Sequence, residues 1–151
     1  MENTLSVAKY LYNSYFEHFG KPMDQMRLHK LMYFVQRESL MYKKEVLFKE
    51  PFLGWRYGPV LYSVRREYQT GNLFSDVSDE VSEDTRQLAE QVLKRYGSFS
   101  AWKLSSLSHR ELSWKRARKG LDASDNGNVE LELSAMKVDA VKELAERKWY
   151  E

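Results

Sequence analysis

Apolar residues recur every three or four positions along the first part of the chain. From Leu5 to Phe19 they form a single stripe, which is typical of an amphipathic helix, with Thr4 in position to cap it. Gly20 interrupts the pattern, and Asp24 is suited to cap a second helix that carries the apolar residues from Leu28 to Met41. The pattern therefore predicts a helical hairpin with a short turn.

Two short segments alternate between apolar and polar residues, as strands do. The first is Pro51 to Tyr57, and the second is Asn128 to Leu133, where glutamates separate the apolar residues. An isolated strand leaves its backbone groups unpaired, and neither segment has another candidate partner. We therefore predict that the two segments pair antiparallel.

The other elements are predicted to be helices, with loops at Asn72 to Ser82 and at Asp122 to Asn128. Gly58 and Pro59 are expected to start a third helix, because proline is tolerated in a first turn, and Gly71 is expected to end it. Later helices are predicted at Glu83 to Tyr96, Ser98 to Leu107, Ser113 to Lys119 and Ala135 to Trp149. With no repeat and no linker, the sequence predicts a mainly α (α+β) fold. We expect a single compact domain over residues 1–151, with about six helices and a small two-stranded antiparallel sheet.

The amino-acid composition excludes several classes of function. Cysteine is absent, which excludes disulfides, thiolate metal sites and cysteine nucleophiles and suits a cytoplasmic protein. The N-terminal segment lacks the pattern of a signal peptide, and no apolar run is long enough for a membrane span. The formal net charge of +2 is too balanced to indicate nucleic-acid binding by itself. Aromatic residues make up 14% of the chain, so they form either a thick core or a surface for a partner.

His109 is the most interesting candidate for chemistry, because Glu111, Trp114 and Arg118 follow it closely. It could serve as a base or a switch near neutral pH. The simpler interpretation is a histidine that connects two helices, since no catalytic constellation accompanies it. His29, beside Lys30, is expected to be exposed. There is no phosphate loop, no nucleophile elbow and no metal-binding pair of histidines, so we predict neither an enzyme nor a cofactor or metal site.

A basic cluster could hold phosphate groups; it comprises Arg110, Lys115, Arg116, Arg118 and Lys119. The N-terminal helical hairpin is superficially similar to a helix-turn-helix. Its second helix, however, is too apolar around its circumference to lie in a DNA groove. DNA binding is therefore the weaker hypothesis.

Three stretches of the chain stand out together: LHKLMYFVQ (28–36), WRYGPVLYSV (55–64) and LSSLSHRELSWKRAR (104–118). In this order they resemble the Panacea, or SocA-like antitoxin, domain family. The resemblance extends from Val7 to roughly Tyr150. The chain departs from the family pattern at Arg37, where glycine is usual, and at Ser108 and Ser113, which replace threonine and proline. Glycine would allow a closer approach to the second helix than Arg37 does.

The resemblance implies a mainly helical antitoxin of a bacterial or prophage toxin-antitoxin pair, in which some members deliver the toxin to a protease. The leading hypothesis is a type II antitoxin that binds a cognate toxin; the alternatives are a DNA-binding regulator of its own operon and an enzyme that uses His109. The motif residues expected to be structural are Tyr33, Trp55, Tyr57, Gly58, Pro59 and Trp114, with both tryptophans largely buried. Those expected to bind the partner are Lys30, Gln36, Tyr62, His109, Arg116 and Arg118, with Arg118 and its basic neighbours foremost, followed by exposed tyrosines of the first and third helices. For Lys30, Gln36, His109 and Arg118, a buried polar network that only fixes the fold is an equal alternative.

Overall fold

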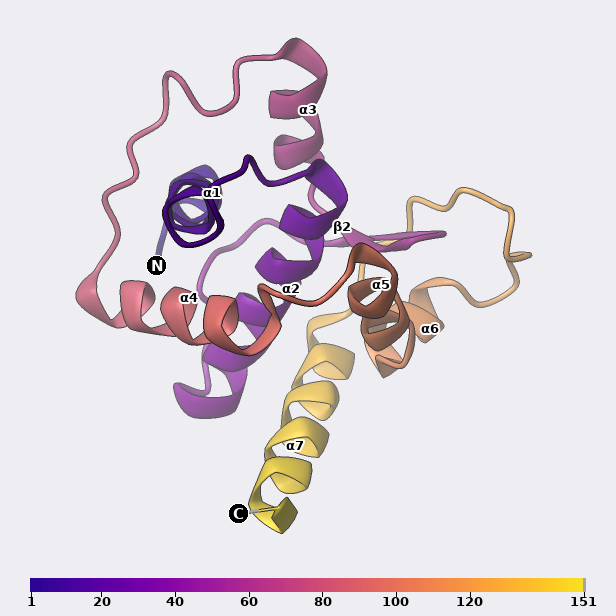
Figure 1. Cartoon of the computed structure of the whole chain (residues 1–151). Helices are drawn as coiled ribbons and strands as arrows, with labels where there is room; N and C mark the ends of the chain where they lie inside the picture. Colours follow the sequence, from indigo (N-terminus) through magenta and orange to yellow (C-terminus); the bar gives the residue numbers. More distant parts are fainter. Residues whose placement is uncertain (151) are drawn as a thin grey trace.

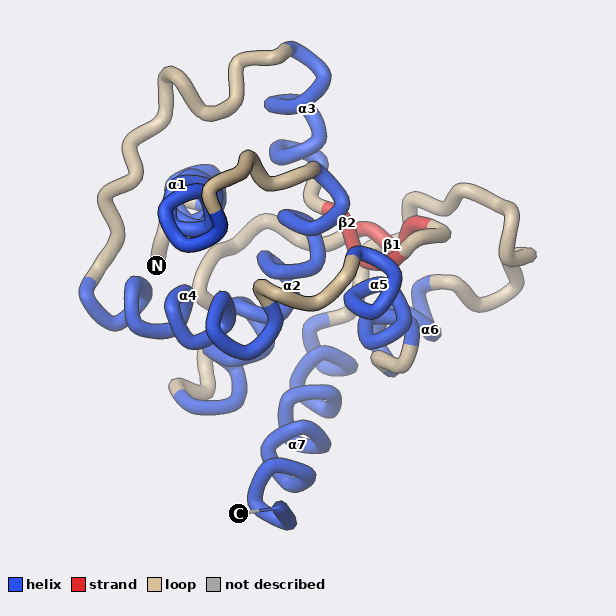
Figure 2. Tube along the Cα trace, in the orientation of Figure 1, coloured by secondary structure: helices blue, strands red, loops and turns tan. Residues whose placement is uncertain are grey.

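Helices make up most of the chain in the computed structural model, which describes residues 1–150 (Figures 1 and 2). This range holds seven helices and one two-stranded sheet, which confirms the predicted mainly α fold. None of these helices is both long and apolar enough to cross a membrane. In chain order the elements are α1 (Thr4–Phe19), α2 (Gln25–Tyr42), β1 (Leu53–Trp55), β2 (Gly58–Val60), α3 (Tyr62–Thr70), α4 (Glu83–Tyr96), α5 (Ala101–His109), α6 (Leu112–Ala117) and α7 (Leu133–Tyr150).

Helix α2 is the element around which the others pack (Figure 1). It contacts α1, α3, α4, α5, α7 and β2, and every residue from Leu28 to Met41 is buried. A helix of a globular protein usually leaves one face in water. Because α2 leaves none over this stretch, its polar side chains must find partners inside the protein.

The predicted helix ends largely agree with the structure. Asp24 caps α2 by accepting a hydrogen bond from a backbone N–H one turn later, and Gly20 adopts a left-handed φ of 70° that ends α1. The predicted cap of α1 is wrong, because Asn3 rather than Thr4 accepts from Ser6 N at 3.1 Å. Helix α4 has its predicted bounds, while α5, α6 and α7 are shifted by one to three residues.

The sheet is a tight hairpin of β1 and β2. The predicted helix start at Gly58 and Pro59 is wrong, since these residues form β2 and pair antiparallel with β1, with Leu53 opposite Val60. Gly58 has a φ of 123°, which only glycine adopts readily. Helix α3 therefore begins only at Tyr62.

The other edge of β1 meets the segment predicted as the second strand, Asn128 to Leu133. Gly54 N donates to Val129 O at 2.8 Å, and Leu53 forms an antiparallel bridge with Glu130. The predicted antiparallel direction of the pairing is therefore confirmed. The pairing is limited to one bridge, however, and residues 128–133 do not form a regular strand. The segment has little length for pairing because α7 begins at its end.

Much of the aromatic surplus lies in the core around α2. Phe34 of α2 stacks on Tyr96 of α4, with 4.3 Å between ring centroids, and both rings are buried. The prediction that Trp55 and Trp114 are largely buried is wrong in degree, because both are only half-buried beside the hairpin. The aromatic residues of the core are thus phenylalanines and tyrosines, packed among leucine, valine, methionine and alanine side chains.

A buried ion pair ties α7 to α2. Both amino groups of Arg147 donate to the carboxylate of Glu38, at 2.5 and 2.9 Å, and both side chains are almost fully buried. Arg147 also donates to the hydroxyl of Tyr96 at 3.1 Å. Removing one partner of such a buried pair destabilises the fold, because the remaining charge stays buried and cannot be hydrated.

We expect Arg147→Leu to lower the free energy of unfolding by about 3 to 5 kcal/mol, since it leaves Glu38 buried and unpaired. Urea unfolding followed by circular dichroism measures this. The double variant Arg147→Leu with Glu38→Gln should recover much of the loss, and Lys148→Leu, on the exposed side of α7, should change little. An unchanged unfolding midpoint for Arg147→Leu would contradict the structural role of the pair.

Candidate functional site

The motif residues converge on the β1–β2 hairpin from several elements. Lys30 of α2 is 0% exposed, and its Nζ has no hydrogen-bond partner among the described residues. A Cβ atom at Gly58 would overlap this amine and would lie 2.7 Å from Ser108 Oγ. Glycine is therefore required at this position both by its backbone conformation and by the lysine beneath it.

His109, at the end of α5, lies beside this lysine. Its ring stacks on Trp114 with 4.2 Å between centroids, and its Nε2 is buried without a partner in the described chain. Burial lowers the pKa of His109, and the neighbouring Lys30 lowers it further, although the carbonyl of Tyr57 opposes this. Burial also lowers the pKa of Lys30 to about 7. The site thus joins two basic groups, and neither forms an ion pair with a carboxylate among residues 1–150.

Trp114 and Arg118 of the motif fix the hairpin from the side of α6. Trp114 Nε1 donates to the carbonyl of Trp55 at 2.7 Å. Arg118 donates to the carbonyls of Gly54, Asp122 and Asp125, and it is only 8% exposed. Contrary to its expected place on a binding surface, Arg118 holds the following loop against β1.

Gln36 has a similar internal role elsewhere on α2. Its amide nitrogen donates to Phe48 O at 2.9 Å, and its amide oxygen accepts from Leu47 N at 2.6 Å. The side chain is 3% exposed, so it secures the connection between α2 and β1.

His29 is also internal, and its predicted exposure is wrong. Its Nδ1 accepts from Leu61 N at 3.1 Å, and 1% of the residue is exposed. Burial lowers the pKa of His29 to about 3, and the charges of Lys30 and Arg65 act in the same direction. The imidazole is therefore neutral and serves to position the residue before α3.

Aromatic and arginine side chains remain exposed around the hairpin and form what we term the hairpin face. The exposed fractions are 53% for Tyr57, 54% for Tyr62 and 82% for Trp102. The hydroxyl of Ser105, one turn after Trp102, donates to the carbonyl of Tyr57 at 3.0 Å and so holds α5 against the hairpin. The exposed members of the hairpin face are Arg56, Tyr57, Tyr62 and Trp102, and the half-buried Trp55 and Arg65 complete it.

Two arginines of the hairpin face are ordered by aromatic rings. The guanidinium of Arg56 lies 4.8 Å from the ring centroid of Tyr57, and that of Arg65 lies 4.7 Å from the ring centroid of Trp55.

Of the remaining residues expected to bind a partner, Arg116 is exposed. One of its guanidinium nitrogens lies 3.9 Å from a carboxylate oxygen of Glu132. The tyrosines of α1, expected to be exposed, are half-buried or buried.

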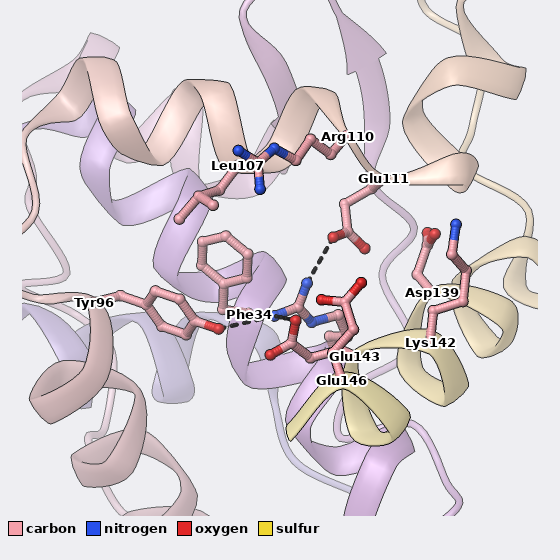
Figure 3. A pocket seen from close by; sticks show the side chains of 10 residues that line it. Phe34, Tyr96, Leu107, Arg110, Glu111, Asp139, Lys142, Glu143 and Glu146 are labelled. Atoms are coloured by element: carbon pink, nitrogen blue, oxygen red, sulfur yellow. Dashed lines mark hydrogen bonds and ion pairs between the residues drawn. The ribbon is translucent and has the colours of Figure 1, made fainter. Parts of the chain in front are cut away.

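A second polar cluster lies between α2 and the α5–α6 corner (Figure 3). Arg37 donates to Glu111 at 2.6 Å and to the hydroxyl of Tyr96 at 2.9 Å. The hydroxyl of Tyr33 donates to Glu111 at 2.8 Å and also contacts Asp139 of α7 at 3.2 Å. Arg37 therefore joins elements that are distant in the sequence. No spacing in the sequence indicates this cluster.

The comparisons with known proteins agree with the motif residues. The model of the family described as antitoxin SocA-like, Panacea domain, matches residues 28–115. The chain belongs to this family. The search of curated proteins and the search of solved structures found no match.

The Panacea match runs from α2 into α6 and contains most of the site. Lys30, Gly58, His109 and Trp114 lie within it, whereas Arg118 lies just beyond its end. The hairpin face is also within the matched residues. The family description supports an antitoxin role for this Panacea domain.

The buried amine of Lys30 predicts an unusual dependence of stability on pH. The pKa of lysine is 10.5 in the unfolded chain and about 7 in the fold, so between these values the unfolded state binds more protons. The free energy of unfolding should therefore rise from about pH 7 to about pH 9, by up to about 1.4 kcal/mol per pH unit.

Lys30→Met should abolish this rise and stabilise the Panacea domain at neutral pH by about 1 to 3 kcal/mol. Denaturant unfolding at several pH values measures both effects. Lys21→Met, which removes an exposed lysine, is the matched control and should keep the wild-type pH profile. Parallel profiles for wild type and Lys30→Met would show that the amine is hydrated and charged in the fold.

Proposed function

We propose that this chain is the antitoxin of a type II toxin-antitoxin system and that it neutralises a cognate toxin by binding it directly. Membership in the SocA-like antitoxin family supports the role. The observation that carries direct binding is the hairpin face, where Tyr57, Tyr62 and Trp102 are more than half exposed. Tyrosine, tryptophan and arginine are the residue types in which binding energy concentrates at protein interfaces.

The hairpin face is also well supported from beneath. Trp114 and Arg118 bind the carbonyls of β1, and Lys30 and Ser108 pack under Gly58. A face that is already ordered loses little conformational entropy when a partner binds. Its charged members, Arg56 and Arg65, are both cationic, so the complementary surface of the toxin is expected to be acidic.

Action by binding rather than by catalysis is part of the proposal. The two bases of the site, Lys30 and His109, each have a nitrogen without a hydrogen-bond partner among the described residues, and Lys30 is 0% exposed. General acid–base catalysis needs groups within reach of a substrate. We place the protein in the cytoplasm, where a toxin made in the same cell would meet it. Delivery of the bound toxin to a protease is an extension of the proposal that rests on the resemblance alone.

The alternative is a DNA-binding regulator of its own operon. The exposed basic residues of the α5–α6 region favour it; they are Arg110, Lys115, Arg116 and Lys119. Against it, α2 is buried from Leu28 to Met41, so the α1–α2 hairpin offers no second helix to a major groove. Direct protein binding is therefore the function that the geometry supports better.

Co-expression with the product of the adjacent gene should rescue growth, and the two proteins should co-purify. Tyr57→Ala and Tyr62→Ala should each weaken the complex by about 2 kcal/mol or more and reduce rescue, because each removes an exposed aromatic anchor. Phe16→Ala is the matched control, since Phe16 is 52% exposed on α1, and it should bind as the wild type does.

Failure of the wild-type chain to bind or suppress any neighbouring product would refute the antitoxin proposal. Arg116→Glu distinguishes DNA binding from protein binding. If the chain binds DNA, this variant should lose the salt-dependent gel retardation of promoter DNA from its own operon, while a protein complex at the hairpin face should stay intact. Arg118 is unsuitable for this test, since its side chain holds three backbone carbonyls. If a protease takes part, toxin levels should fall over time in cells that contain the chain.

A further inference from the structure

The outer side of α7 carries a row of apolar side chains that the rest of the described chain does not cover. Val138, Val141 and Trp149 are 44%, 64% and 83% exposed, and Ala145 between them is exposed as well. Figure 1 shows the C-terminal half of α7 extending beyond the other elements, which leaves this side open. Single exposed apolar residues are common on proteins, but these four form a continuous strip, which we term the α7 seam.

The α7 seam has the spacing of a helix that pairs with another helix. Its residues follow one another at intervals of three, four and four positions, so their side chains line one side of the helix. From Val138 to Trp149 the seam extends for about 17 Å along the helix axis. A narrow seam of this kind is typical of helix pairing, whereas a helix that lies on a membrane surface carries a wider apolar face.

The inner side of α7 is fixed to the rest of the fold. Asp139 accepts hydrogen bonds from the backbone N–H groups of Leu112 and Ser113, at 2.7 and 3.0 Å, and Arg147 pairs with Glu38. A partner at the α7 seam therefore meets a helix that is already ordered, and little conformational entropy of this helix is lost on binding.

Lysines border the α7 seam on both sides. Lys137, Lys142 and Lys148 are exposed, and none of them forms an ion pair within residues 1–149. The exposed carboxylate of Glu146 also lies at this border, but the lysines outnumber it. The border is therefore positive, and the complementary surface carries acidic residues beside its own apolar residues.

The same lysines disfavour a second copy of this chain as the occupant. In an antiparallel pair of α7 helices, with Val138 against Trp149 of the second copy, Lys137 would lie beside Lys148 of the second copy. In a parallel pair, Lys137 would lie beside Lys142 of the second copy. Like charges that face each other across a helix pair destabilise it and so select against that partner.

We infer that the α7 seam binds an acidic amphipathic helix of another protein. The apolar residues of that helix pack on Val141 and Trp149, and its glutamates or aspartates pair with the bordering lysines. The α7 seam is separate from the hairpin face and lies beyond residues 28–115, which match the family model. It can thus be occupied whether or not the chain is an antitoxin.

The test uses the full chain and a fluorescently labelled helical peptide of about three heptads, with leucine at the a and d positions and glutamate at the flanking positions. The flanking glutamates also keep the peptide from pairing with itself. Fluorescence anisotropy should show binding that weakens as salt is added, because the ion pairs at the seam are exposed. The matched peptide with lysine in place of each flanking glutamate should bind at least about tenfold more weakly.

Variants of exposed residues locate the binding surface without disturbing the core. Trp149→Ala and Val141→Glu should each raise the Kd of the acidic peptide by about tenfold or more. Trp102→Ala is the matched control, since Trp102 is 82% exposed on the hairpin face, and it should leave this Kd unchanged. Conversely, Trp149→Ala should leave a toxin complex at the hairpin face intact, so the two surfaces can fail independently.

Reversing the charge of the border provides a rescue experiment. The triple variant with glutamate at Lys137, Lys142 and Lys148 should bind the lysine peptide in preference to the acidic one. Thermal melting verifies that each variant is folded.

Equal binding of the two peptides, no binding of either, or wild-type binding of the acidic peptide by Trp149→Ala would overturn the inference. Two further results would also overturn it, because they assign the α7 seam to another occupant. One is self-association of the chain in sedimentation experiments that Val141→Glu abolishes. The other is binding to phosphatidylglycerol vesicles that Trp149→Ala abolishes.

Discussion

The burial of α2 on all sides is the constraint on which the rest of the structure depends. Its interior carries His29, Lys30, Gln36, Arg37 and Glu38, and polar groups in such a place need partners. These partners come from different parts of the chain: the residue before α3, the connection to β1, the α5–α6 corner and α7. Among the buried side chains of α2 between Leu28 and Met41, the amine of Lys30 and the Nε of Arg37 remain without a hydrogen-bond partner in the described residues. The polar interior of α2 thus fixes where the surrounding elements lie.

This arrangement explains why the motif residues divide into two groups. Those that point inward, such as Gln36 and Arg118, hold backbone carbonyls and are unavailable to a partner. Those that remain outside, such as Tyr57 and Tyr62, are presented by a hairpin that the inward group supports. A rigid scaffold that carries an exposed aromatic face suits a protein that acts by occupying another protein.

The sequence predicts the helices of this fold well because their apolar spacing and caps are local signals, as at Asp24 and Gly20. It fails at Gly58 and Pro59, where the same residues can start a helix or begin the second strand of a hairpin, and the local pattern does not distinguish the two. The pairing of Glu38 with Arg147 joins residues more than a hundred positions apart, so no local pattern reveals it. Lys30, His109 and Trp114 could be selected from the family resemblance, but their stacking and burial required the structure.

Amide hydrogen exchange of the chain, alone and bound to the product of the adjacent gene, tests the central claim most directly. In the free chain, the amides of α2 between Leu28 and Met41 should exchange slowest, since the fold is organised around them. In the complex, the amides of residues 55–62 and 101–106 should exchange more slowly than in the free chain, while the exchange rates of α2 stay unchanged. Protection confined to α1 or α7, or fast exchange in the middle of α2, would contradict the account.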